Sequence, residues 1–442
     1  MAVLQRMASA DTAWLHMDRP TNLMVVNCVF WFDRPLDWDD VARAFAERLV
    51  PAFPRFAQRA VEPPVTIGVL VPMWTDVDDF DVADHLVRCT LPAPGGDEQL
   101  HAYVSGQAGV PLDPGRPLWQ AHLIDGYSRD GAGTGCAILL RTHHAIADGT
   151  ALVQALLTLV DTHGSGSHPD QLPRPSAPAS TPGGSLLSRG IGMVQQLADR
   201  NAMLRRLGFG QSDDPSPLRG QLSGRKQLTW SPPSPLEPVK EAGRRSGATV
   251  NDLALTAVTG ALRRYLEKHG RAVDRLTAVV PVNLRPLDQP MNPLRGNQFG
   301  LAFVPLPVSE PDVSRRLAAV HAAMGTVKAT GEGVVTSGAL SVMGHMPAAI
   351  EQKWLDLFAG RATAVVTNIA GPREEVSLAG VPLRGFTAWV PSTGPVGVGL
   401  SICSYAGELQ LGVAVDEALV PDSDMLLAAL DDEVAELRQL GT

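Results

Sequence analysis

The 442-residue sequence predicts an α/β protein built from two lobes of similar size. A chain of this length usually exceeds what one hydrophobic core organises. A segment rich in Pro, Ser and Gly, "HGSGSHPDQLPRPSAPASTPGGS", begins at His163 and sustains neither a helical nor a strand pattern. We therefore expect a first lobe over residues 1–163, a crossover over 164–220 and a second lobe over 221–442. Both halves mix strand and helix patterns, which indicates α/β lobes.

The first half contains short apolar runs and longer amphipathic runs. The runs "HLVRC", "WQAHLID" and "CAILLRT" predict strands at 85–89, 119–125 and 136–142, because they are short, apolar and β-rich. The runs "DWDDVARAFAERLV" and "EQLHAYVSGQA" predict helices at 37–50 and 98–108.

The second half begins with the strongest helical pattern of the chain, at 249–270. Leu253, Ala257, Leu262 and Leu266 line one face, and Gly270 stands where a helix ends. Apolar runs then predict five strands, at 275–284, 300–308, 363–371, 398–407 and 409–416. The sequence contains no G-x-G-x-x-G or Walker pattern, so it does not indicate a nucleotide-binding fold.

Within the crossover, one more apolar piece extends over 186–207. Leu187, Ile191, Val194 and Leu197 recur at helical spacing. Two interpretations stay open: an interfacial helix resting on a lipid surface, or a helix that covers part of the core.

Composition excludes several classes of protein. A net charge of −9 argues against a general nucleic-acid binder, which needs Lys and Arg to neutralise phosphates. The cysteines form no C-x-x-C pair, so neither a zinc site nor a disulfide framework is indicated. The first residues do not form a signal peptide, and the run "MVVNCVFWF" is far shorter than the ~18–20 residues that span a bilayer. We expect a cytoplasmic protein that is soluble or lies on a surface.

The stretch "ILLRTHHAIADGTALVQALL" carries the most reactive groups. It places His143 and His144 at the end of a predicted strand, just before a helix that begins near Asp148. Successive strand side chains point to opposite faces, so only one histidine should enter a given cleft. An imidazole with a pKa near ~6.5 can accept a proton at neutral pH. Asp148 would orient an imidazole or pair with a buried Arg.

Alternatives to a catalytic role also fit these residues. A histidine pair can be half of a metal site, but no H-E-x-x-H or third ligand at a recognisable spacing accompanies it. Asp148 followed by Gly149 can also be an ordinary helix N-cap beside a permissive turn.

The run "HHAIADG" matches the H-H-x-x-x-D-G signature of acyl-CoA-dependent acyltransferases and of peptide-synthetase condensation domains. More narrowly, the chain resembles the bacterial wax ester synthase/acyl-CoA:diacylglycerol acyltransferase family almost end to end. Pro117-Leu118-Trp119 matches the family's P-L-W motif, and Asn251-Asp252 its N-D motif. The other similar segments are "ASADTAWLHMD", "PVNLRP", "GNQFG", "TNIAGP" and "SYAGELQLGVAVD".

The resemblance implies a two-lobed chloramphenicol acetyltransferase-like fold with mixed β-sheets, flanking helices and an active site in the channel between the lobes. It implies an O-acyltransferase that makes triacylglycerol or wax ester, with His144 as general base. His143 and Gly149 would shape the loop. Asp148 would be structural, with Arg285 as its candidate partner.

Roles for the other motifs stay open at this stage. Trp119 would pack in the core or contact substrate. Asn251 would be an N-cap, and with Asp252 it would support the active-site wall or contact substrate. Asn283, Asn297 and Asn368 could each donate to an oxyanion.

The expected partners are acyl-CoA, as a substrate, and diacylglycerol or a fatty alcohol, at a membrane or lipid-inclusion surface. No metal or cofactor is expected, and the sequence leaves the oligomeric state open. No motif marks a site for the phosphates of CoA, although Arg244 with Arg245, or Arg263 with Arg264, could meet them. Two other functions compete: a condensation-type acyltransferase that takes its acyl group from a carrier protein, and a catalytically silent lipid-surface binding protein.

Overall fold

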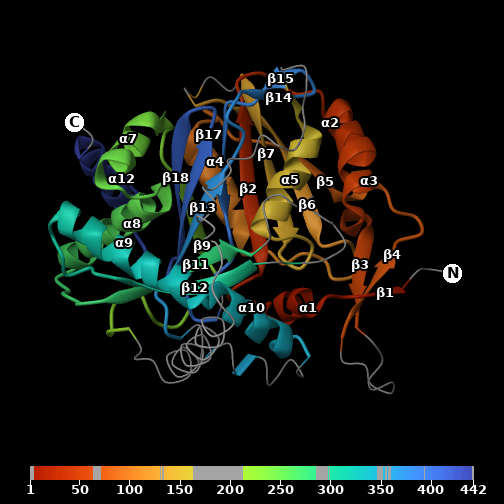
Figure 1. The fold of residues 1–442 in the computed structure, drawn as a ribbon. Coiled ribbons are helices and arrows are strands. Elements are labelled where there is room, and N and C mark those ends of the chain that lie inside the picture. The colour runs from red at the N-terminus through yellow and green to blue at the C-terminus, as the bar shows by residue number, and fades with distance from the viewer. Residues whose placement is uncertain are drawn as a thin grey trace, which may run out of the picture.

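Two large β-sheets lie side by side and carry most of the helices on their outer faces (Figure 1). The computed structural model describes residues 4–62, 71–129, 131, 134–162, 213–284, 297, 299–345, 352–353, 356, 360–392 and 394–440.

The first sheet has five strands in the order β16-β2-β7-β6-β5. β5 runs parallel to β6, and the other neighbours are antiparallel. All nine residues of β7 are buried, which explains why its first six residues, Gly135 to Leu140, are apolar without alternation. The strands are β2 (Val25–Phe32), β5 (Leu86–Thr90), β6 (Trp119–Tyr127), β7 (Gly135–His143) and β16 (Gly385–Trp389).

The second sheet has the order β10-β18-β17-β13-β11-β12, with β9 paired to β18. β13 is parallel to both β11 and β17, and the remaining pairs are antiparallel. The strands are β9 (Lys226–Trp230), β10 (Ser234–Pro235), β11 (Leu276–Asn283), β12 (Phe299–Leu306), β13 (Ala364–Ala370), β17 (Val398–Tyr405) and β18 (Glu408–Asp416).

Helices cover both sheets. In Figure 1, α7, α8, α9 and α12 gather beside the second sheet, whereas α2, α3 and α5 lie beside the first. The longer helices are α1 (Ser9–His16), α4 (Asp97–Ala108), α5 (Gly149–Leu159), α7 (Glu237–Ser246), α8 (Val250–Lys268), α9 (Val313–Thr330), α10 (Glu332–Met343) and α12 (Ser423–Gln439). Between β2 and β3 come α2 (Trp38–Ala44), a π-helical turn (Phe45–Leu49), α3 (Val50–Ala52) and a 3₁₀ turn (Pro54–Ala57), and a second 3₁₀ turn (Val82–His85) precedes β5.

Two small sheets complete the fold. One joins β1 (Leu4–Arg6), β4 (Met73–Asp76) and β3 (Gln58–Val61), and the other joins β15 (Val381–Pro382), β14 (Val376–Leu378) and β8 (Asp161–Thr162).

The second half of the chain contributes a strand to the first sheet. β16 pairs antiparallel with β2, from Gly385 opposite Trp31 to Trp389 opposite Asn27. Near this pairing, the Trp230 ring of β9 lies 6.2 Å from the Trp31 ring and 5.5 Å from the Trp389 ring. The two halves are therefore joined by hydrogen-bonded strands as well as by side-chain packing.

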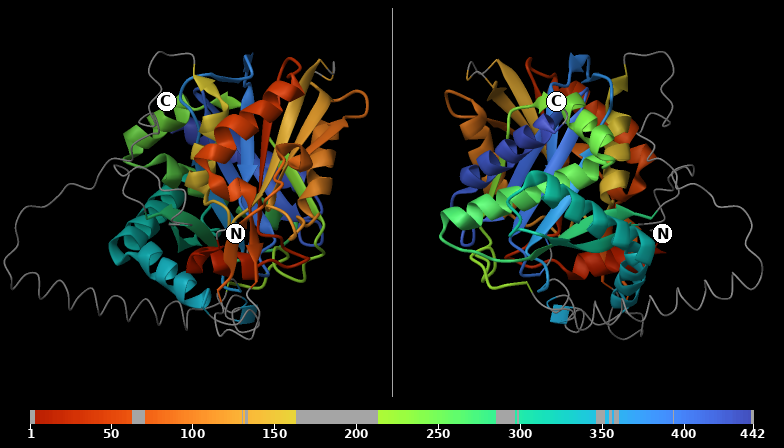
Figure 2. Two further views of the ribbon diagram at one scale, coloured as in Figure 1. Left: turned by 90° about the vertical axis from the view of Figure 1, so that its right-hand side faces the viewer. Right: turned by 60° about the vertical axis from the view of Figure 1, so that its left-hand side comes forward.

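The N-terminal helix α1 lies against α10 from the second half, as the views of Figure 2 show. Their backbones approach closely, because a methyl group added at Gly344 would overlap the Ser9 carbonyl oxygen. Glycine is thus required at this crossing to let the two elements touch.

Each predicted strand is present in the described residues, and so are the helices predicted at 37–50, 98–108 and 249–270 and the helix expected to begin near Asp148. Several observed elements were not predicted from the sequence. They are the helices α1, α7, α9, α10 and α12, the strands β2, β9, β10 and β16, and the strands of the two small sheets. The expected helix at 186–207 lies outside the described residues.

Candidate active site

The histidine pair is attached through its backbone to both neighbouring strands of the first sheet. The amide of His143 donates to the Leu118 carbonyl at 2.9 Å, and the amide of His144 donates to the Met24 carbonyl at 2.8 Å. β7 ends at His143, and a turn then closes with the Ile146 amide donating to the His143 carbonyl at 3.0 Å. The turn is thereby fixed on two sides before α5 begins.

The His144 imidazole is enclosed by aromatic rings and is only 4% exposed. It stacks on Trp14 of α1, with ring centroids 4.2 Å apart and planes at 22°, and lies 5.2 Å from the ring of Phe299. This burial lowers the pKa of His144 to about 4, although the nearby Asp148 carboxylate acts in the opposite direction. His144 is therefore neutral at physiological pH and can accept a proton.

His143 has different neighbours. Its Nδ1 accepts a hydrogen bond from the Ala145 amide at 3.1 Å, and its Nε2 lies 3.7 Å from Oδ2 of Asp18. The other Asp18 oxygen accepts from the Met24 amide at 2.5 Å. The two imidazoles thus have separate surroundings, as strand alternation predicts.

Asp148 is the N-cap of α5. Its carboxylate accepts from the Ala151 amide at 2.8 Å, and its backbone is extended, as an N-cap requires. An added methyl group at the adjacent Gly149 would meet no atom within 4 Å in the part of the chain that the structure describes. Arg285, the expected partner of Asp148, lies outside the described residues, so that pairing stays a prediction.

Asp11 of α1 and Asn297, which lies just before β12, form a hydrogen-bonded pair next to the His144 carbonyl. Asp11 is 1% exposed, and its Oδ1 accepts from the Asn297 backbone amide at 2.8 Å and from Asn297 Nδ2 at 2.7 Å. The same Nδ2 donates to the His144 carbonyl at 2.9 Å. Because both of its carboxamide N–H groups are engaged, Asn297 does not serve as an oxyanion donor in this arrangement.

The P-L-W residues are all buried, and one of them, Leu118, supports the histidine turn. Leu118 supplies the carbonyl that binds the His143 amide, as described above. The Trp119 indole donates to the Phe56 carbonyl at 2.8 Å and stacks on His85 with centroids 4.6 Å apart. Trp119 therefore packs in the core, which is the first of the two roles considered from the sequence.

The N-D residues begin α8. The expected N-cap role of Asn251 is wrong, because Thr249 caps the helix and Asp252 completes a capping box by accepting from the Thr249 amide at 2.9 Å. Asp252 also accepts from Nδ1 of His321 at 2.9 Å. Within the described residues, no hydrogen bond joins these groups to the histidine pair.

The four arginines considered for CoA phosphates all bind carboxylates of the chain itself. These ion pairs neutralise them and favour structural roles. The partners are Glu237 and Glu241 for Arg244, Glu241 for Arg245, Glu267 for Arg263, and Glu433 and Glu436 for Arg264.

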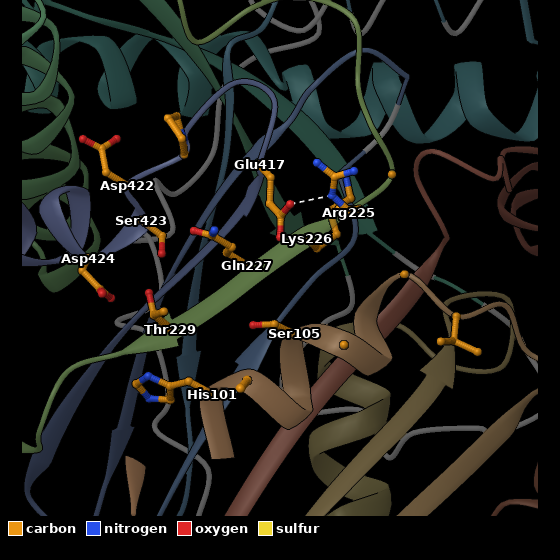
Figure 3. A pocket seen from close by; sticks show the side chains of 16 residues that line it. His101, Ser105, Arg225, Lys226, Gln227, Thr229, Glu417, Asp422, Ser423 and Asp424 are labelled. Atoms are coloured by element: carbon orange, nitrogen blue, oxygen red, sulfur yellow. Dashed lines mark hydrogen bonds and ion pairs between the residues drawn. The ribbon is translucent and has the colours of Figure 1, made fainter. Parts of the chain in front are cut away.

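A cavity of about 700 Å³ lies among α4, β9 and the start of α12 (Figure 3). Arg225 and Glu417 form an ion pair at 2.6 Å on its wall, and His101 and Asp424 come from the two helices. His143 and His144 are not among its lining residues. This cavity is thus separate from the histidine turn.

Comparison with known proteins identifies the family. The model of the wax ester synthase/diacylglycerol acyltransferase catalytic domain matches residues 7–254, more than half of the chain, and the model of the C-terminal domain of the same family matches residues 295–438.

The chain belongs to the wax ester synthase/diacylglycerol acyltransferase family.

Two relatives illustrate the match to this family. The chain is 26% identical to a putative diacylglycerol O-acyltransferase of Mycobacterium tuberculosis, over 95% of this chain and 88% of that protein. The structure of a wax ester synthase/diacylglycerol acyltransferase from Marinobacter aquaeolei VT8 superimposes with a TM-score of 0.67, at 20% identity, over 99% of this chain and 100% of that one.

The family's two-lobed fold extends to condensation domains. The first condensation domain of the calcium-dependent antibiotic synthetase superimposes with a TM-score of 0.61 at 16% identity, over 99% of this chain and 96% of that chain. The expected chloramphenicol acetyltransferase-like architecture is thereby confirmed.

The sequence analysis did not identify the residues of the N-terminal segment that lie around the two histidines. Asp11, Trp14 and Asp18 all lie in or next to "ASADTAWLHMD", and each contacts one of the histidines or a residue that binds them. The spacing of Asp11 and Trp14, three positions apart, places both on one face of a helix. From that spacing it could have been inferred that Asp11 and Trp14 contact the same part of the molecule.

Proposed function

We propose that this chain transfers a long-chain acyl group from acyl-CoA to the hydroxyl of diacylglycerol or of a long-chain alcohol, which forms triacylglycerol or wax ester. The observation that carries the proposal is the neutral, buried His144 in the H-H-x-x-x-D-G turn of a wax ester synthase/diacylglycerol acyltransferase family member. The named relatives support this reaction rather than a carrier-dependent condensation.

In the proposed mechanism, His144 is the general base. A ring nitrogen takes the proton of the acceptor hydroxyl while the oxygen attacks the thioester carbonyl. The tetrahedral intermediate then collapses, the carbon–sulfur bond breaks, and the CoA thiolate leaves and recovers the proton from the imidazolium. The acyl group passes directly to the acceptor, so the catalytic demand on the protein is to hold both substrates in register.

Burial of His144 supports this role at both ends of the cycle. The low pKa keeps the imidazole unprotonated before reaction, and it makes the imidazolium a ready proton donor to the leaving thiolate. His143 and Asp148 act on the turn: the first accepts from the Ala145 amide, and the second caps α5.

We further propose that the enzyme works at a membrane or lipid-inclusion surface, because its acceptors and products partition into lipid. No helix in the described part of the chain has the length and apolar character needed to cross a bilayer. Acyl-CoA is a substrate in this proposal, and neither a cofactor nor a metal takes part. The expected cytoplasmic location stays a prediction.

The test is CoA release by the purified protein given palmitoyl-CoA with dioleoylglycerol or with hexadecanol, beside a His144→Ala variant of confirmed fold. We expect release that depends on an acceptor and falls by at least about 100-fold in the variant, since general-base catalysis supplies ~10²–10⁴-fold. Release by the variant at the wild-type rate would contradict the role of His144. Ester product formed only when an acyl-carrier-protein thioester replaces palmitoyl-CoA would contradict the choice of donor.

A further inference from the structure

We propose that Asp11 and Asn297 are positioning residues for the acyl transfer: Asp11 fixes the Asn297 carboxamide, and Asn297 holds the backbone carbonyl of His144. This inference rests on the proposed role of His144 as general base. It assigns a function to the N-terminal helix and to the "GNQFG" segment, which lie almost 300 positions apart in the chain.

The contact between Asp11 and Asn297 is short and has two points. Asp11 Oδ1 accepts from the Asn297 backbone amide at 2.8 Å and from Nδ2 at 2.7 Å. Asp11 is 1% exposed and Asn297 is 8% exposed, so water does not compete for these bonds. Such paired bonds set both the position of the Asn297 backbone and the plane of its carboxamide.

The carboxamide of Asn297 can take only one orientation. Its nitrogen lies 2.7 Å from the Asp11 carboxylate and 2.9 Å from the His144 carbonyl, and both of these groups only accept hydrogen bonds. A reversed carboxamide would place its oxygen against two other oxygens. The donor to the His144 carbonyl is therefore defined by the chemistry of its neighbours.

The same helix also holds the other end of His144. Trp14, three residues after Asp11, stacks on the imidazole with centroids 4.2 Å apart. α1 thus acts on His144 twice, through Asn297 on the backbone and through the indole on the ring. Since a misplacement of about 1 Å at a reacting group can cost ~10²-fold in rate, loss of this support should lower kcat.

Burying an ionised carboxylate is unfavourable for folding, which argues against a purely structural origin of the contact. Desolvation raises the pKa of Asp11 to about 6, against the bonds from Asn297 and the charge of Arg55, and the nearby Asp148 carboxylate raises it further. In proteins generally, replacing buried charged groups by well-packed apolar residues of similar volume is often neutral or stabilising.

The test measures kcat, KM for palmitoyl-CoA and melting temperature for four variants. Asp11→Ala and Asn297→Asp each remove the donor–acceptor match, and we expect kcat to fall about 10- to 100-fold with little change in KM. Asp11→Asn keeps an oxygen that accepts both bonds, so kcat should stay near the wild-type value.

The fourth variant, Asp11→Asn with Asn297→Asp, separates positioning from folding. Asn at position 11 can donate to Asp at position 297, so the pair forms again and the melting temperature should recover towards the wild type. A carboxylate at position 297 cannot donate to the His144 carbonyl, so kcat should remain low. A merely structural pair would recover both.

Asp213→Asn is the matched control. Asp213 is also buried and accepts from Thr277 and Thr363, and within the described residues no hydrogen bond joins it to the histidine turn. Its substitution should lower the melting temperature without lowering kcat. Wild-type kcat in Asn297→Asp, or recovery of kcat in the exchanged pair, would overturn the inference. Full activity of His144→Ala would instead overturn the proposed function on which it rests.

Discussion

His144 combines a titratable imidazole with almost complete removal from solvent. Desolvation penalises the imidazolium and lowers the pKa from 6.5 to about 4. A base of this kind is unprotonated at neutral pH but is a weak proton acceptor, so its contribution to the rate depends on where the substrate hydroxyl is placed. This makes the groups that fix its position, Trp14 and Asn297, as relevant as the imidazole itself.

The rate should therefore show no loss at the usual histidine pKa. We expect kcat/KM to stay level as the pH falls through 6.5, with the acidic limb due to His144 near 4, because the free enzyme keeps this imidazole neutral. The measurement is kcat/KM for palmitoyl-CoA between pH 5 and 8 in buffers of constant ionic strength. An inflection near 6.5 that disappears in a residual-activity profile of His144→Ala would contradict the assignment.

Stability should respond to the same shift. The folded-state pKa of His144 is lowered, so its contribution is complete above about 6.5 and is lost as the pH falls towards about 4. Asp11 acts in the opposite direction, because its folded-state pKa is raised to about 6 and protonation favours the folded state. The effect of His144 is isolated by the difference in free energy of unfolding between wild type and His144→Ala, measured in urea at pH 7.5 and at pH 5. Between these two pH values, the wild type should lose more free energy of unfolding than the variant.

At the scale of residues, the histidine turn itself could be predicted, because a strand end, two imidazoles and a cap are local in the sequence. The contacts of Asp11 and Asn297 could not, since their partners lie in distant segments and the sequence gives no distance between them. The same reason explains the error at Asn251: a residue two positions earlier, Thr249, matched the capping geometry better.

At the scale of elements, α1 is held in place by its crossing with the end of α10. Gly344 touches the backbone of Ser9 and lies close to the Ala13 amide. α1 in turn carries Trp14, which stacks on His144. The position of α10 is thereby coupled to the imidazole through one short helix.

Gly344→Ala should push α1 away from α10. We expect a cost of roughly 1–3 kcal/mol in the free energy of unfolding, since overpacking forces the backbone to shift, together with a lower kcat. Gly338→Ala in α10 is the matched control: among the described residues its added methyl group meets no atom within 4 Å, and it should stabilise by about 0.5–1 kcal/mol. Urea unfolding and CoA release measure both effects, and unchanged kcat in Gly344→Ala would show that α1 does not transmit the displacement.

The main strands of both large sheets could be predicted, because their periodicity is local. The strands β5, β6 and β7, and the helix α8, follow directly from apolar runs and helical spacing. β2 was read only as an apolar stretch too short to cross a bilayer, and α1 is too short and too weakly amphipathic to give a helical signal. β16 has only five residues, all of them buried, so it shows no alternation.

At the scale of the whole molecule, the first sheet is assembled from both halves of the chain. β16 forms one edge of this sheet, and without it the largely buried β2 would present its unpaired backbone to solvent. Sequence patterns do not reveal such a pairing, because neither strand encodes the identity of its partner.

Residues 1–212 expressed alone should aggregate or remain unfolded, since an exposed apolar edge strand pairs with other chains. Co-expression with residues 213–442 should yield a soluble complex with CoA-releasing activity. Solubility and the near-ultraviolet circular dichroism spectrum of each fragment provide the measurement. A soluble first fragment with a sharp thermal transition would contradict the dependence on β16.

The β16–β2 pairing also restricts how members of this family can be recombined. A chimera joined in the crossover would combine a β2 from one parent with a β16 from the other, and Gly385, whose added methyl group would overlap the Trp31 indole, would face a foreign side chain. A productive chimera would therefore take residues 385–389 from the same parent as the N-terminal half. The strands that pair in the first sheet would then come from one parent, although they lie far apart in the sequence.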